Sequence, residues 1–251
     1  QGFGDTIQFC RYIPMAAERC PRILMAASKE MQPIVMQQKG ITEYYDRWEQ
    51  MPAFDAYCSL SGLPKLFGTD LNNIPAPVPY VKADPAKSEH WRKKLDALTP
   101  PGYRRMGLVW AGRPTHGNDF NRSTSLRQLA PLMAQPNIAF VSLQKGEGQN
   151  QIGSYFGTAP LINFGAEIED FTDTMGILDN LDRLFTVDTG VAHLAGAMGR
   201  PFSIPVPFAP DWRWLLHRSD TPWYPTVTLH RQDRPGDWGS AIAKALDLIR
   251  A

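Results

Sequence analysis

Short apolar runs alternate with amphipathic segments along the second half of the chain. A nearly continuous apolar run such as LFTV, residues 184–187, is typical of a strand in a parallel sheet, because both faces of such a sheet are covered. Apolar residues spaced three and four apart indicate the intervening helices. The alternation predicts a parallel α/β fold. We expect strands near 106–110, 138–143, 160–163, 183–187, 202–206 and 226–230, and helices near 126–134, 171–180, 190–198 and 238–250.

The first half shows the same rhythm in a weaker form. Apolar spacing predicts a helix from Thr6 to about Glu18, with a kink or early end at Pro14. Another helix is expected over 88–98, with Ser88 as its N-cap. The pattern further predicts strands over 22–27 and 54–60 and a helix over 29–38.

A proline-rich hinge separates the two halves. Residues Thr99-Pro100-Pro101-Gly102 lie between a predicted helix and the first clear strand of the second half. We therefore predict two parallel α/β domains, 1–98 and 103–251. Two such domains form a cleft between the carboxyl ends of their sheets, where ligands of these sheets bind.

Composition limits the classes of partner. The 251 residues carry 26 Lys and Arg against 25 Asp and Glu, so there is no overall basic field for nucleic acid or an anionic membrane. No apolar run approaches the roughly 20 residues of a membrane helix. The three cysteines, Cys10, Cys20 and Cys58, lack metal-ligand spacing and are interpreted as buried thiols of a reducing compartment. These features predict a cytoplasmic protein, at most peripheral to a membrane, and no resident metal or cofactor.

The segment Asp188-Thr189-Gly190 lies where a predicted strand ends and a helix begins. The first turn of such a helix presents unpaired backbone N–H groups, which suit a phosphate or diphosphate. Thr189 would cap the helix or bind a phosphate oxygen, and Gly190 allows close approach of the ligand. His193 would donate to the same anion, or it is a histidine satisfied inside tight packing. Asp-Thr-Gly after an apolar pair is also the signature around the catalytic carboxylate of aspartic proteases. That chemistry needs a second Asp-Thr/Ser-Gly, which the sequence lacks.

The amino-terminal segment Gly2-Phe3-Gly4-Asp5 is predicted to be a glycine-rich turn. It would project Asp5 into the cleft, where a carboxylate can take a proton from an acceptor hydroxyl. The alternative is a purely structural role, in which Asp5 only caps the following helix. Because such turns normally follow a buried strand, we expect that strand to precede the segment in a longer protein. As a dinucleotide fingerprint the segment is weak, since Ile7 stands at the third glycine position.

A polar loop over 112–125 contributes further candidate ligands of a phosphate or a sugar, namely Arg113, His116 and Arg122. Lys145 follows the next strand and offers a point charge. Each of these side chains is equally compatible with a solvated loop. The aromatic segments 208–215 and 221–225 would stack on a base or sugar, or they plug the core beneath a long loop.

Taken together, "GFGD", "LVWAGRPTHGNDFNRS", "SLQKG", "VDTGVAHLAGAMGRP" and "PFAPDWRWL" resemble the heptosyltransferase-like glycosyltransferases of family nine. The similarity is strongest to the group found downstream of tetratricopeptide repeats in bacterial proteins. The resemblance covers essentially the whole chain. It implies a GT-B fold of two Rossmann-like domains facing a cleft, with the nucleotide-sugar donor held mainly by the second domain.

The resemblance also implies roles for individual residues. Asp5 matches the acid of the family's G-x-G-D segment, the proposed catalytic base. Asp188, Thr189, Gly190 and His193 match its donor-diphosphate segment. The implied reaction is metal-independent, inverting transfer of a sugar, with an ADP-heptose-like donor among the options, to a hydroxyl of a glycan, lipid or protein. It further implies upstream tetratricopeptide repeats and a location in the cytoplasm or at the inner membrane.

Two alternatives remain from the sequence. One is a sugar-nucleotide-binding or interaction domain without turnover, and the weaker one is a sugar-nucleotide epimerase of the same fold. The enzyme interpretation differs from the first in requiring Asp5.

Overall fold

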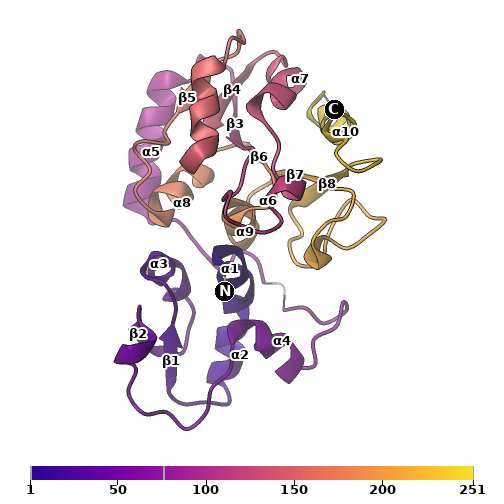
Figure 1. Cartoon of the computed structure of the whole chain (residues 1–251). Helices are drawn as coiled ribbons and strands as arrows, with labels where there is room; N and C mark the ends of the chain where they lie inside the picture. Colours follow the sequence, from indigo (N-terminus) through magenta and orange to yellow (C-terminus); the bar gives the residue numbers. More distant parts are fainter. Residues whose placement is uncertain (1, 76, 251) are drawn as a thin grey trace.

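A computed structural model describes residues 2–75 and 77–250. A six-stranded parallel sheet, in the order β5-β4-β3-β6-β7-β8, forms the centre of its larger part (Figure 1). Every residue of β4 and β7 is buried, as their largely apolar sequences predict. All six strands expected in this half are confirmed. They are β3 (Arg104–Val109), β4 (Ile138–Ser142), β5 (Leu161–Asn163), β6 (Arg183–Thr186), β7 (Phe202–Val206) and β8 (Val227–Arg231).

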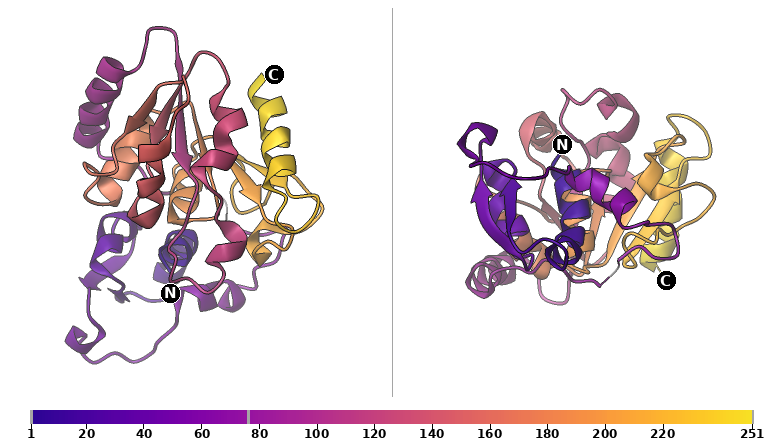
Figure 2. Two further views of the ribbon diagram at one scale, coloured as in Figure 1. Left: turned by 45° about the horizontal axis from the view of Figure 1, so that its top comes forward. Right: turned by 90° about the horizontal axis from the view of Figure 1, so that it is seen from below.

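Helices cover both faces of this sheet (Figure 2). Apolar residues of α5 (Pro85–Leu98), α8 (Phe171–Asp179) and α9 (Gly190–Ala197) belong to one core cluster. A second cluster lies on the opposite face and joins the sheet to the other helices. These are α7 (Ala130–Met133), α10 (Trp238–Arg250) and the 3-10 turn η5 (Leu126–Leu129). The predicted helices of this half are therefore confirmed, with 126–134 divided into η5 and α7.

The first half contains a smaller parallel sheet of two strands, β1 (Ile23–Ala26) and β2 (Ile41–Tyr45). The predicted first helix is present as a nearly continuous series in which a 3-10 turn separates two α-helical pieces. The series is α1 (Phe3–Phe9), η1 (Cys10–Tyr12) and α2 (Ile13–Ala17). The remaining elements of this half are η2 (Lys29–Met31), α3 (Gln32–Val35), η3 (Trp48–Gln50), η4 (Leu60–Gly62) and α4 (Leu63–Leu66).

Several sequence-based expectations are wrong in detail. The segment 54–60 is irregular except for its last residue, because no neighbouring strand pairs with it. The second strand is instead β2. Asp84, not Ser88, caps α5, and its carboxylate accepts from the backbone N–H groups of Ala86 and Lys87. Only Cys10 among the three thiols is buried, since Cys20 follows the end of α2 and Cys58 lies in the irregular segment.

The glycine-rich segment is also not a turn. Gly2 is the N-cap of α1, and Gly4 and Asp5 already lie in its first turn. This places Asp5 on a regular helix, whose backbone holds the carboxylate more firmly than a flexible turn would.

The two halves share one continuous hydrophobic core, which includes residues of α1 and α9. Helix α5 belongs to the predicted first domain but packs on α8, and Trp91 of α5 donates its indole N–H to Asp173 of α8 at 3.1 Å. The division into 1–98 and 103–251 remains a prediction. No helix among the described residues is long and apolar enough to cross a bilayer.

Candidate active site

The two helices that carry the sequence motifs begin beside one another. A Cβ placed on Gly4 of α1 would lie only 2.6 Å from Cδ2 of His193 on α9. A Cβ on Gly190 would lie 3.5 Å from Cβ of Phe3. Figure 1 shows α1 directly below α9 at the junction of the two halves. The glycines therefore bring the segment containing Asp5 against the segment containing Asp188 and His193.

His193 faces inward from α9 and is only 2% exposed. Its Nδ1 lies 2.8 Å from the hydroxyl of Tyr224, and its Nε2 lies 3.7 Å from Oδ1 of Asp188. The ring also packs against Trp214, with centroids 5.5 Å apart. Burial lowers the pKa of His193, and the positive charge of Arg213 acts in the same direction, while Asp188 opposes them. The imidazole is thus neutral at pH 7, which favours a positioning role over direct binding of an anion.

Asp188 is the ionised partner of this pair. Burial would raise the pKa of its carboxyl, but hydrogen bonding from His193, with smaller effects of Trp214 and Arg213, holds it below the usual value. The carboxylate lies just before α9 and orients His193 beneath the start of that helix.

Thr189 and Gly190 form the start of α9. Thr189 is its N-cap residue, but the side chain does not cap the helix, and the hydroxyl lies 3.3 Å from that of Thr186. Both Thr189 and Gly190 are partly exposed. The first N–H groups of an α-helix have no acceptor within the helix, so this end is suited to an anion.

Asp5 faces a cation that the sequence reasoning missed. Nη2 of Arg213 donates to Oδ1 of Asp5 at 2.6 Å, although the two residues are 208 positions apart. Arg213 lies on η7 (Trp212–Trp214), and its side chain is only 12% exposed. Its Nε also lies 3.4 Å from Oδ1 of Asp211. The ion pair joins α1 to a loop of the second half and fixes the direction of the Asp5 carboxylate.

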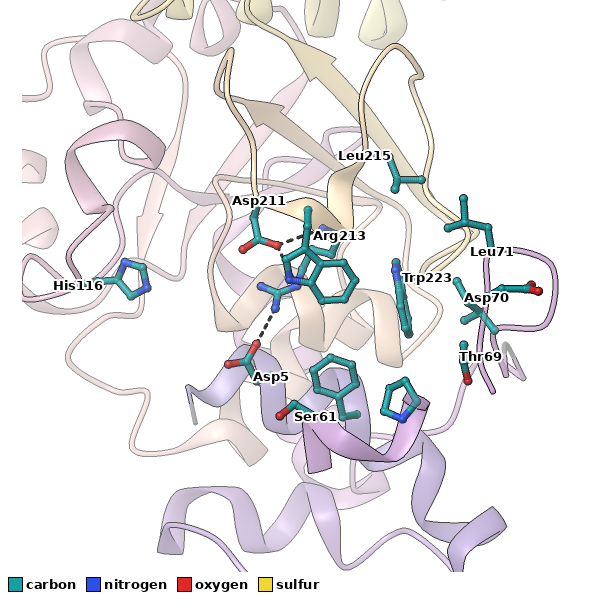
Figure 3. A pocket seen from close by; sticks show the side chains of 14 residues that line it. Asp5, Ser61, Thr69, Asp70, Leu71, His116, Asp211, Arg213, Leu215 and Trp223 are labelled. Atoms are coloured by element: carbon teal, nitrogen blue, oxygen red, sulfur yellow. Dashed lines mark hydrogen bonds and ion pairs between the residues drawn. The ribbon is translucent and has the colours of Figure 1, made fainter. Parts of the chain in front are cut away.

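A pocket of about 740 Å³ opens beside this ion pair (Figure 3). That volume falls within the range of small-molecule sites. The lining combines aromatic rings with charged and hydroxylated side chains from both halves of the chain. The lining residues are Asp5, Phe9, Ser61, Pro64, Thr69, Asp70, Leu71, Ile74, His116, Asp211, Trp212, Arg213, Leu215 and Trp223.

Of the remaining predicted ligands, which lie in the loop 112–125 or at Lys145, only His116 lines this pocket. His116 is exposed and lines the pocket. Arg122 lies in the short helix α6 (Asp119–Arg122), where its Nε is 3.3 Å from Oδ1 of Asp119. Lys145 donates to the backbone carbonyl of Ile168. Arg113 is exposed and, like Arg122 and Lys145, does not line the pocket. Among the described residues, no group of three or more His, Cys, Asp or Glu side chains is arranged to hold a metal ion.

Comparison with known proteins identifies the fold. No protein-family model matches the chain. It is 22% identical over 276 residues to the protein FlbA of Caulobacter vibrioides, and the match spans 100% of the chain but only 45% of that relative. The structure resembles E. coli ADP-heptose lps heptosyltransferase II, with a TM-score of 0.61, 12% identity and coverage of 100% of this chain and 96% of the other.

It also resembles the glycosyl transferase family 9 structure from Veillonella parvula DSM 2008. Here the TM-score is 0.62 and the identity 8%, and the match covers 97% of this chain and 88% of the other. These likenesses, together with the two parallel sheets, show that the chain has the α/β GT-B fold of such glycosyltransferases.

Proposed function

We propose that this chain is a glycosyltransferase of the family-nine type, which moves a sugar from a nucleoside-diphosphate donor to a hydroxyl acceptor. The observation that carries the proposal is the meeting of α1 and α9. In a fold like that of a heptosyltransferase, it brings Asp5 and the segment from Asp188 to His193 to one junction, beside a pocket large enough for a substrate.

In the proposed reaction, Asp5 removes the proton of the acceptor hydroxyl. The acceptor oxygen then forms a bond to the anomeric carbon as the bond from that carbon to the diphosphate oxygen breaks. A single displacement of this kind inverts the anomeric configuration. The electron pair of the broken bond leaves with the diphosphate, whose charge is stabilised by the N-terminus of α9.

The finer features of the proposal follow from the same residues. Helix N–H groups and guanidinium groups supply the positive charge that a divalent metal would otherwise provide, so the transfer is metal-independent. Arg113, His116, Arg122 and Lys145 are proposed to contact the donor after local rearrangement, and an ADP-heptose-like sugar is one candidate. An association with tetratricopeptide repeats and a cytoplasmic location complete the proposal, because the family resemblance implies both.

The decisive experiment replaces the base. Asp5→Asn keeps the size of the side chain but removes the proton acceptor, so we expect transfer to fall by about 10²-fold or more, while the affinity for the nucleotide changes less than twofold. Rates are measured as release of nucleoside diphosphate, and nucleotide affinity by calorimetry. Asp247→Asn on α10 is the control, because this exposed residue lies outside the pocket.

Other outcomes identify the alternatives. If Asp5→Asn turns over as fast as the wild type, Asp5 is not the base. Nucleotide binding without transfer to any acceptor would support a binding module without turnover. A change of the donor sugar in the absence of acceptor would support the epimerase.

A further inference from the structure

An exposed indole lines the pocket. Trp212 is 54% exposed, whereas Phe9 and Trp223 beside it are buried. The Phe9 ring is nearly parallel to Trp212 at 6.4 Å, and the Trp223 ring meets it edge-on at 5.7 Å. The two buried rings hold the exposed one in place. Such an indole offers an apolar platform with a low entropic cost of binding, on which the C–H face of a sugar ring can stack.

The charges beside Trp212 favour a ligand that donates hydrogen bonds. Figure 3 shows Asp5 and Asp211 on either side of the Arg213 guanidinium. Both carboxylates direct Oδ1 toward Arg213, so the second oxygen of each remains available as an acceptor. A carboxylate accepts hydrogen bonds only, and hydroxyl groups are suitable donors.

The same cluster disfavours an anionic ligand. Arg213 already faces two aspartates, so the three side chains together carry an excess of one negative charge. The fourteen described lining residues include a third aspartate, Asp70, but no lysine and no second arginine. A phosphate or carboxylate on the ligand would therefore be repelled here.

We propose that this pocket binds the acceptor, and that the acceptor end it recognises is an uncharged, polyhydroxylated sugar ring stacked on Trp212. The inference rests on the proposed function in naming the ligand an acceptor. Its hydroxyls donate to the free oxygens of Asp5 and Asp211, and the hydroxyl held by Asp5 is the one that loses its proton. Recognition by charge, as for a phosphorylated acceptor, has no place in this pocket.

Matched pairs of simple sugars test the proposal on the whole chain. The neutral probes are the methyl glycosides of glucose, galactose, mannose and N-acetylglucosamine, and the anionic probes are methyl glucuronide and methyl galacturonide. Affinities are measured by saturation-transfer NMR at low ionic strength, where charge repulsion is least screened. We expect saturable binding of at least one neutral hexoside, and at least fivefold weaker binding of the corresponding uronide.

Two tryptophan variants locate the binding. Trp212→Ala is expected to weaken binding of the neutral glycoside by at least tenfold. Trp48→Ala is the matched control, because Trp48 is 51% exposed but lies outside this pocket. We expect the affinity of this variant for the neutral glycoside to stay within twofold of the wild type. Trp212→Phe keeps an aromatic platform and retains intermediate affinity, so the test stands even if Trp212→Ala folds poorly.

The proposal is overturned if no glycoside binds, if a uronide binds more tightly than its neutral partner, or if the two alanine variants behave alike. It is likewise overturned if a neutral serine-containing peptide binds and no glycoside does. A separate titration with nucleoside diphosphates distinguishes the two proposals. If sugars bind but nucleotides do not, the proposed glycosyltransferase function is refuted and the sugar site stands. If nucleotides bind but sugars do not, the sugar site is refuted and the proposed function stands.

Discussion

Arg213 is the residue on which the site's geometry depends most. It contacts Asp5 directly, and its charge also lowers the pKa values of His193 and Asp188. Sequence reasoning singled out the aromatic residues around Arg213 but not the guanidinium itself. No local pattern reveals a pair 208 positions apart, because its partner is set by how the two halves pack. Asp5, by contrast, could be named from its motif.

Substitution of Arg213 tests whether it positions the base. Arg213→Gln loses the ion pair, and we expect kcat to fall about 10²-fold through misorientation of Asp5, while the KM for the donor changes less than threefold. Arg213→Lys keeps the charge without the planar fork and should recover part of kcat. Steady-state kinetics separate the two parameters. Arg234→Gln, in an exposed ion pair with Asp237, serves as the control, and an equal loss there would contradict the assignment.

His230 makes the stability of the fold sensitive to mild acid. Burial on β8 lowers its pKa to about 4, and repulsion by Arg183 and Lys244 adds to the effect. In the unfolded chain the pKa of His230 is about 6.5. Below that pH the unfolded state therefore binds a proton at His230 that the folded state does not bind. The contribution of neutral His230 to the unfolding free energy is complete above about pH 6.5 and is lost as the pH falls toward 4.

We therefore expect His230→Gln to reduce the difference in unfolding free energy between pH 7.5 and pH 5.0. The reduction should be about 2 kcal/mol, because pH 5.0 lies about 1.5 units below the unfolded value. Urea denaturation at both pH values measures it. Exposed His116→Gln is the control. An unchanged pH dependence in His230→Gln would show that this side chain is not protonated on unfolding.

At the scale of elements, α1 and α9 fit together only because glycine stands at position 4. Gly4 has an ordinary place in the helix, so what matters is the missing side chain over the His193 ring. Gly2 lies two residues earlier, at the N-cap, and offers a matched comparison. A Cβ there meets nothing closer than Oδ2 of Asp5 at 3.8 Å, which is an ordinary contact.

Gly4→Ala should separate the helices. A Cβ 2.6 Å from the buried imidazole forces a shift of α1, with an expected loss of about 1–3 kcal/mol in unfolding free energy. Transfer activity should fall with it, because Asp5 moves as α1 moves. Gly2→Ala should stay within about 0.5 kcal/mol of the wild type. Urea denaturation compares the two variants, and equal stability would show that the contact is easily relieved.

The elements also show where sequence patterns succeed. β6 and α9 were predictable because the buried part of the strand is largely apolar, and small residues mark tight packing of the next helix. The two-stranded sheet is different. β2 has no fully buried residue, so its sequence carries no strong alternation, whereas the apolar residues at 54–60 have no strand to pair with. Whether each segment forms a strand depends on a neighbouring strand to pair with, and the sequence pattern does not contain that information.

For the whole molecule, Arg11 joins the two halves, and no carboxylate among the described residues pairs with it. Its guanidinium is buried and donates to the backbone carbonyl of Trp223 at 2.9 Å, to that of Pro75 at 3.3 Å and to the hydroxyl of Tyr80 at 2.9 Å. The Tyr80 ring lies 4.6 Å from the guanidinium carbon. These contacts hold the helical series that carries Asp5 against the loop that carries Arg213, so the integrity of the site depends on them.

Loss of this connection should loosen the first half selectively. Arg11→Met keeps an apolar stem but leaves buried acceptors without a donor, and we expect a loss of about 3 kcal/mol in unfolding free energy. Hydrogen exchange should accelerate within 2–75 while β3, β4 and β6 keep their protection, because those strands pair with one another in the larger sheet. Arg22→Met breaks only an exposed pair with Glu43 and should leave the unfolding free energy nearly unchanged. If exchange instead rises equally throughout the chain, the two halves unfold as one unit, and Arg11 contributes to general stability without acting as their specific connection.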